Sequence, residues 1–258
     1  MAVDPVSQLG KHLINFKRKI PLYANLWAYY EGEQPLVYSA DRLREVFPNI
    51  DADFTQNWCL VVVDALLDRI ILQGFEVVDD VPSTDEMIRQ FNLMQLDLLS
   101  QQVHLGMLVC GESFLVAVPQ ENVLPEDRQQ WEGEEPALYV FPNDPASCDV
   151  IYSSRNPNMM LSAAKWWEDD EDGRIHVELY TAEAIYYFRS KDRKESISEL
   201  NDAGSFTLKG AAENTIGRIP VFHFRNRLRR SRGELRSVIP IQDSINKLNT
   251  DMLIAAEF

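Results

Sequence analysis

The stretch at residues 105–118, LGMLVCGESFLVAV, decides the fold because the pattern of its apolar residues changes at Gly111. Up to that glycine, apolar residues spaced three and four apart predict one long helix over residues 84–109. A capping box at residues 83–86 marks its expected start. After the glycine, residues 112–118 form a short apolar run rich in valine, which is typical of a strand.

The residues on the N-terminal side of this stretch predict further helices. Residues 7–30 are expected to form one or two short helices split by Pro21, and Gly32 is expected to end the second. Three more elements are predicted in this half of the chain: a short helix at 41–46, a helix at 55–72 and a short strand at 75–78.

The residues after Gly111 predict a β-rich region. Eight strands are expected, at 112–118, 137–141, 148–152, 161–167, 174–180, 184–188, 205–208 and 219–224. Asp172 and Gly173 between two of them predict a hairpin turn. Because no helical pattern separates the strands, they are expected to pair antiparallel. The fold class is therefore α+β: helices including one long helix, a mainly antiparallel β region, and a C-terminal helix.

The last segment returns to a helical pattern. Pro240 suits the first turn, and apolar residues then recur at spacings of four and three up to Ala255. Asp243 and Lys247 add a pair of opposite charges one turn apart. The pattern is still running at Phe258, so we expect the helix to continue in a longer chain.

Composition limits the classes of function. The chain has 258 residues, of which 40 are acidic and 25 basic, for a net charge of −15. Such an excess of negative charge disfavours nonspecific binding to nucleic acid or to an anionic membrane. No run approaches the roughly 18 apolar residues of a membrane span. Three widely spaced cysteines fit reduced thiols rather than a disulfide framework.

Motifs for catalysis or cofactor binding are missing. The sequence has neither of the glycine-rich nucleotide loops, and the strand after Gly111 has Leu115 where a nucleophile elbow needs glycine. None of the four histidines has a second histidine or cysteine at metal-binding spacing. The acidic run at residues 168–173 fails as a calcium loop because Leu179 stands where a bidentate glutamate is required. We therefore predict no catalytic residue, cofactor or metal, and a solvated acidic hairpin tip.

One locally basic segment stands out in this acidic chain. Six arginines fall within twelve residues: Arg225, Arg227, Arg229, Arg230, Arg232 and Arg236. Their guanidinium groups could grip phosphates, which would make the segment a nucleic-acid-binding module. Alternatively, they could pair with carboxylates of a neighbouring subunit or of the same chain. This second interpretation is favoured because carboxylates are abundant and stacking aromatics are missing from the cluster. A hydrolase with a dispersed catalytic site is the less favoured third alternative.

The order of the segments resembles the portal proteins of tailed bacteriophages, specifically the siphophage portal family of actinobacteriophages. The likeness spans nearly the whole chain, and no single motif carries it alone. Four stretches carry it: 29–32; 61–69 with 73–75; 103–114; and 219–222 with Asn226, Arg227 and 233–235.

The resemblance implies a structural subunit without enzymatic activity. It implies a dodecameric homo-oligomeric ring at the portal vertex of the virion capsid, assembled in the host cytoplasm and with no membrane association. Genomic double-stranded DNA would pass through the ring during packaging and ejection, and the ring would dock the terminase large subunit, head–tail adaptors and capsid proteins.

The resemblance also divides the chain. It implies a helical part of the wing at residues 1–110, a β-rich part at 111–224, and a basic linker and helix at 225–258 that lead toward the stem. The family's stem helices, clip and channel loop would lie beyond Phe258.

Overall fold

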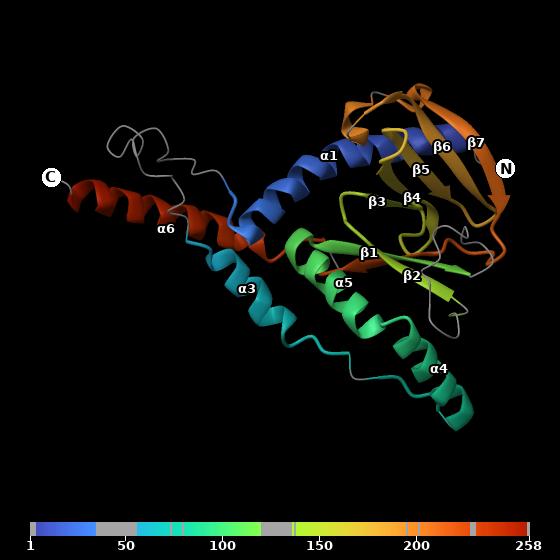
Figure 1. The fold of residues 1–258 in the computed structure, drawn as a ribbon, viewed down its shortest axis with the longest axis horizontal. Coiled ribbons are helices and arrows are strands. Elements are labelled where there is room, and N and C mark those ends of the chain that lie inside the picture. Colours follow the sequence, from blue (N-terminus) through green and yellow to red (C-terminus); the bar gives the residue numbers. More distant parts are fainter. Residues whose placement is uncertain are drawn as a thin grey trace. The chain divides into compact units, whose positions relative to one another are not determined.

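The computed structural model describes residues 4–34, 56–72, 74–78, 80–119, 136, 138–194, 196–200, 202–227 and 231–256 (Figure 1). The chain forms two compact units. The sheet unit comprises residues 1–22, 72–103 and 113–224, and the helical unit comprises 23–71, 104–112 and 225–258. The short helix predicted at 41–46 lies outside the described residues. No helix among those described is long and apolar enough to cross a membrane.

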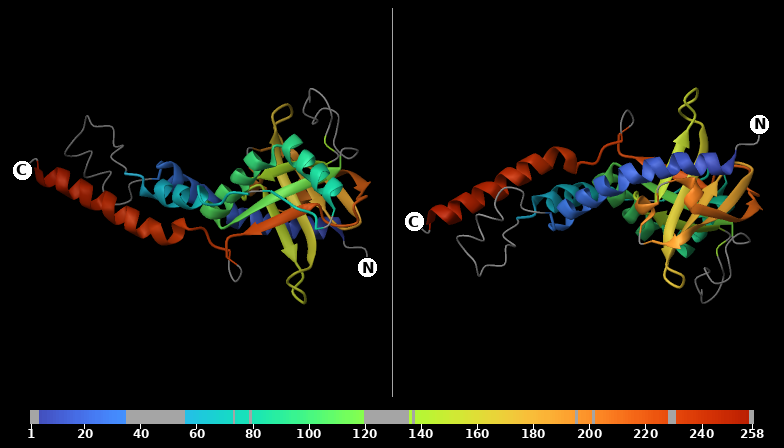
Figure 2. Two further views of the ribbon diagram at one scale, coloured as in Figure 1. Left: turned by 90° about the horizontal axis from the view of Figure 1, so that it is seen from below. Right: turned by 90° about the horizontal axis from the view of Figure 1, so that it is seen from above.

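The first helix, α1 (Pro5–Glu31), is continuous, and the right-hand view of Figure 2 shows it as one helix. The predicted split at Pro21 is therefore wrong. Buried apolar side chains precede the proline, as at Phe16, and follow it, as at Leu26. Each such burial contributes about 1.5–3 kcal/mol, which together offsets the cost of about 3 kcal/mol for an internal proline. The helix ends as predicted, before Gly32 with its positive φ of 82°.

The long helix predicted over 84–109 is two helices, α4 (Val81–Leu93) and α5 (Leu96–Cys110), which Figure 1 shows as separate. Gln95 interrupts the ridge with a left-handed φ of 51°, and its carbonyl accepts hydrogen bonds from the Leu98 and Leu99 amides in the first turn of α5. The cap is also different from the prediction, since Asp80 rather than Ser83 accepts the amide hydrogen bond at the start of α4.

The helix predicted over 55–72 is shorter than expected. It forms α3 (Trp58–Leu67), and the Asn57 side chain caps it by accepting a hydrogen bond from the Leu60 amide. Residues 75–78 do not form the predicted strand.

All eight predicted strands are present and form two sheets, so the α+β class is confirmed. The five-stranded sheet has the order β3-β4-β5-β6-β7, with every neighbouring pair antiparallel. The three-stranded sheet has the order β2-β1-β8. The strands are β1 (Glu112–Pro119), β2 (Leu138–Asn143), β3 (Cys148–Tyr152), β4 (Met160–Asp169), β5 (Arg174–Tyr180), β6 (Ala184–Arg193), β7 (Phe206–Glu213) and β8 (Val221–Arg225). Gly173, with a φ of 60°, closes the predicted β4–β5 hairpin.

The five-stranded sheet is the middle layer of the sheet unit. On one face, Phe16 and other apolar residues of α1 pack against Val177 and Leu179 of β5. On the other face, Tyr180 packs with Phe114 of the three-stranded sheet. The alternation of side chains along each strand produces the two cores, and it leaves residues such as His176 on the face opposite α1.

Candidate functional site

The arginine segment, residues 225–236, lies in the helical unit. Four of its six arginines are described, and all four are exposed: Arg225, Arg227, Arg232 and Arg236. Arg229 and Arg230 lie outside the described residues. The structure therefore brings at least four cations of the predicted site to the surface of one unit.

Part of the arginine segment is held by contacts within the chain. The Nη2 atom of Arg227 donates to both carboxylate oxygens of Glu234, at 2.9 and 3.1 Å. The side chain of Asn226 donates to the same carboxylate at 2.8 Å, and the guanidinium of Arg232 donates to Ser237 at 2.7 Å. These bonds fix the shape of the segment. An exposed pair such as Arg227–Glu234 contributes no more than about 1 kcal/mol to stability.

Two glycines attach the arginine segment to the end of α5. A Cβ added at Gly233 would lie 1.9 Å from the carbonyl oxygen of Val109. Gly111 has a φ of 95°, and a Cβ there would lie 2.6 Å from the Arg232 backbone. This close approach lets the Glu234 amide donate to the Leu108 carbonyl at 2.8 Å, which satisfies one of the last carbonyls of the helix.

The C-terminal helix α6 (Leu235–Ala256) begins five residues before the predicted start at Pro240. Its faces are inverted relative to an ordinary surface helix. Along one face the polar residues Gln242, Asn246 and Thr250 are 1–4% exposed. Along another, the apolar residues Ile241, Leu248 and Met252 are 61–68% exposed.

The buried polar face of α6 makes hydrogen bonds to backbone amides at the start of α3. The Gln242 side chain accepts a hydrogen bond from the Trp58 amide at 2.8 Å, and Asn246 accepts from the Gln56 amide at 3.3 Å. Gln242 also donates to Asn246 at 3.0 Å. Amides at a helix start have no partner within their own helix, so these two side chains provide one. This need explains why Gln242 and Asn246 occupy the inner face of α6, whereas the Thr250 hydroxyl donates to the Asn246 carbonyl of the same helix.

A buried polar network in the sheet unit has the geometry of a serine–histidine–aspartate triad. His12 Nδ1 lies 2.7 Å from Asp149 Oδ2, and His12 Nε2 lies 2.9 Å from Ser162 Oγ. Lys19 Nζ lies 2.6 Å from the other oxygen of Asp149. Burial would raise the pKa of Asp149, but the hydrogen bond from His12 and the charge of Lys19 outweigh it and lower the pKa below its usual value.

The same network is closed to any substrate. His12 and Ser162 are 0% exposed and Asp149 is 1% exposed. A nucleophile must reach the atom that it attacks, so burial of this depth leaves the serine no substrate. The contacts instead join α1 to β3 and β4, and we assign the network a structural role. The dispersed catalytic site considered from the sequence gains no support from it.

Comparison with known proteins gives one match and one negative result. A search of curated proteins finds no match. The family model described as phage portal protein, SPP1 Gp6-like, matches residues 11–258, which is nearly the whole chain. Portal families are structural, and membership implies an oligomeric ring at the capsid vertex. The resemblance to phage portal proteins is thereby confirmed, and the finer assignment to actinobacteriophages stays a prediction. The chain belongs to the SPP1 Gp6-like family of phage portal proteins.

Proposed function

We propose that this chain forms a wing segment of a dodecameric portal ring through which double-stranded DNA enters and leaves the capsid. The ring docks the terminase large subunit during packaging, and it docks head–tail adaptors afterwards. In this proposal residues 1–110 and 111–224 are the helical and β-rich parts of the wing, and residues 225–258 lead toward the stem. The family match supports the general role, and the surface of α6 supports assembly.

The exposed apolar stripe of α6 carries the proposal. Ile241, Leu248 and Met252 are spaced by seven and four residues, so they share one side of the helix. Burying each of them would contribute about 1.5–3 kcal/mol, whereas exposure contributes nothing. A ring uses two different surfaces of each subunit for its contacts. We assign the stripe to one of these surfaces and a neighbouring subunit as its partner.

The arginine segment supplies a second feature suited to assembly. Its exposed guanidinium groups belong to a chain with a net charge of −15, so every neighbouring copy offers many carboxylates. We assign Arg225, Arg227, Arg229, Arg230, Arg232 and Arg236 to pairing with the neighbouring subunit. The same negative charge disfavours retention of DNA by the ring during its passage.

The stripe is tested in the full-length protein that carries this sequence. Leu248→Asp combined with Met252→Asp places two charges in the proposed contact, so closed rings should be lost in negative-stain images and the mass in solution should fall to that of a monomer. The matched control is Ile14→Asp, since Ile14 is 71% exposed on α1 and lies outside the stripe. Rings of normal number and size in the double variant would overturn the assignment.

The arginine segment is tested by charge reversal. Arg229→Glu combined with Arg230→Glu should impair ring assembly, and raising the salt concentration should impair wild-type assembly in the same direction. Lys247→Glu is the control, because it reverses an exposed charge on α6 that pairs with Asp251 at 2.7 Å. Normal rings with both arginines reversed contradict the pairing. A steep salt-dependent affinity for DNA, lost in the same variant, would favour the nucleic-acid alternative.

A further inference from the structure

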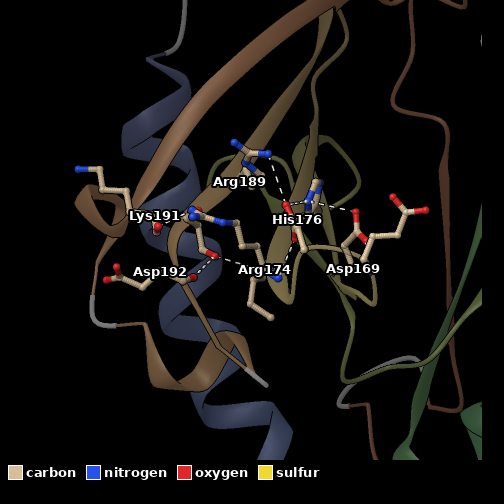
Figure 3. Close-up of polar contacts among 10 residues, drawn as sticks. Asp169, Arg174, His176, Arg189, Lys191 and Asp192 are labelled. Carbon is tan, nitrogen blue, oxygen red and sulfur yellow. Dashed lines mark hydrogen bonds and ion pairs between the residues drawn. The ribbon is translucent and has the colours of Figure 1, made fainter.

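Three side chains with metal-ligand atoms converge at the β4–β5 hairpin, in the sheet unit. Asp169 ends β4, Asp172 lies in the turn, and His176 follows in β5. The antiparallel register places Trp167 opposite His176 and Asp169 opposite Arg174. Because facing residues project from the same side of a sheet, Asp169 and His176 share the face opposite α1. Figure 3 shows the imidazole directed toward Asp169.

The distances within this cluster are those of co-ligands rather than of hydrogen-bonded pairs. His176 Nε2 lies 3.6 Å from Oδ2 of Asp169 and 3.6 Å from Oδ2 of Asp172. These separations exceed a charge-assisted hydrogen bond, which is about 2.7–2.9 Å. Two ligands each about 2.0–2.1 Å from a tetrahedral ion are about 3.4 Å apart. The three ligand atoms all lie within 4.8 Å of one another.

The nitrogen at the centre of the cluster lies within ion-pair distance of both carboxylates but makes no hydrogen bond among the described residues. His176 Nε2 is buried from solvent and has no hydrogen bond among the described residues. Buried polar atoms are almost always hydrogen-bonded, so an unpaired one calls for an explanation such as an ion.

A backbone amide holds each of the two carboxylates in place. Asp169 Oδ1 accepts from the Glu171 amide at 2.9 Å, and Asp172 Oδ1 accepts from the Arg174 amide at 2.8 Å. Each carboxylate therefore uses one oxygen to fix the turn and presents the other, Oδ2, to His176. Outer contacts of this kind orient metal ligands in known sites.

Two further side chains border the cluster. Trp167 stacks on the imidazole of His176, with ring centroids 5.6 Å apart, which restricts rotation of the ring. Arg189, which the register places opposite His176 on β6, has its Nη1 3.4 Å from Asp172 Oδ2. The cation of Arg189 balances part of the negative charge of the two carboxylates, and an incoming metal ion would displace this long contact.

We propose that Asp169, Asp172 and His176 form a Zn²⁺ site with three protein ligands and a fourth position open to water. The set of one imidazole nitrogen and two carboxylate oxygens suits Zn²⁺, whereas Ca²⁺ and Mg²⁺ require more oxygen ligands. The ion joins the end of β4 and the turn to β5 and so fixes the acidic hairpin tip. The sequence predicted no metal here because the calcium-loop spacing fails and no second histidine or cysteine stands at ligand spacing from His176.

The test uses the full-length protein after chelator treatment, without a histidine tag, titrated with Zn²⁺, Co²⁺ and Ca²⁺ in separate experiments. We expect saturable binding of one Zn²⁺ per chain, a rise in the thermal unfolding temperature, and an intense visible spectrum with Co²⁺ that reports tetrahedral geometry. His176→Gln and Asp172→Asn should each weaken Zn²⁺ binding by at least about tenfold.

The matched controls are Asp170→Asn and Glu171→Gln, which change charge in the same exposed turn without touching the three ligand atoms. They should retain the wild-type affinity and Co²⁺ spectrum. Equal weakening by controls and site variants would show nonspecific attraction to the acidic turn and overturn the proposal. So would binding of Ca²⁺ in preference to Zn²⁺, or an unchanged affinity in His176→Gln. Portal ring assembly does not enter any of these readouts.

Discussion

Helices α1 and α6 differ in whether their apolar faces are buried within the chain. The first part of α1 turns Leu9, Leu13 and Phe16 into the core of the sheet unit, each 0–2% exposed. Helix α6 buries Gln242 and Asn246 in the helical unit and leaves its apolar stripe outside. Both helices are amphipathic in sequence. The difference lies in what each apolar face contacts: residues of the same chain for α1 and, in our proposal, a second subunit for α6.

The same amphipathic sequence pattern can therefore contribute either to the stability of the monomer or to assembly. An apolar face that is buried within the chain stabilises the monomer, and its loss should lower the free energy of unfolding. An apolar face that is exposed in the monomer should contribute to assembly only. Substitutions on the two helices therefore have opposite expected readouts.

Phe16→Ala should cause the largest loss. Phe16 is 0% exposed and packs in the core between α1 and the five-stranded sheet. Truncation removes its transfer free energy and leaves a cavity, so we expect the free energy of unfolding to fall by about 4 kcal/mol. Urea denaturation followed by circular dichroism measures the change. A loss below about 1 kcal/mol would mean that α1 does not anchor the sheet. It would contradict the assignment of its apolar face to monomer stability.

Asp149→Asn should cost somewhat less, about 3 kcal/mol at neutral pH, because it leaves Lys19 and His12 beside an uncharged partner in a buried site. The folded pKa of Asp149 is lowered, so its stabilisation is complete above the unfolded pKa of about 3.9 and is lost as the pH falls through the folded value. The gap between wild type and variant should therefore stay constant from about pH 7 to pH 5 and narrow in acid.

The exposed carboxylate Asp170 provides the control for this pH series. Asp170→Asn should show little difference from wild type at any pH, because the residue lies on the surface of the hairpin turn. A gap for Asp149→Asn that widens in acid would contradict the assigned direction of the pKa shift.

Gly233→Ala should have an intermediate effect, about 2–3 kcal/mol, since the new methyl group would collide with the backbone of Val109. Denaturant unfolding of the variant measures the loss. Gly210→Ala is the control because a Cβ there meets nothing within 4 Å. If both variants unfold alike, the close approach of the arginine segment to α5 does not constrain the fold.

The strands were predictable because the sequence features that indicate them lie close together along the chain. Arg174–Tyr180 has the predicted bounds, since alternation and the Asp172–Gly173 turn lie within a few residues of each other. The break at Gln95 was not predictable from periodicity, because the apolar ridge continues across it. Continuity through Pro21 depends on burial of residues on both sides, which the sequence pattern does not report.

The candidate sites depend on contacts that are distant in sequence. His12 meets Asp149 across 137 residues and Ser162 across 150, so no spacing rule could join them. The inverted face of α6 did leave a signal, since Gln242, Asn246 and Thr250 are uncharged polar residues spaced by four. Such side chains suit buried hydrogen bonds, whereas a solvated face usually carries charge. The apolar ridge alone could not indicate which face turns inward.

Leu248→Ala should have the smallest effect on unfolding and separates the two helices most sharply. Leu248 is 61% exposed, so its truncation removes little buried area, and the free energy of unfolding of the monomer should stay within about 0.5 kcal/mol of wild type. In the assembled ring the same truncation should weaken the subunit contact, raising the protein concentration at which rings dissociate. Urea denaturation of the monomer and mass measurement across a dilution series give the two readouts. A destabilised monomer with unaltered rings would reverse the roles assigned to the two faces of α6, because the leucine would then act within its own chain.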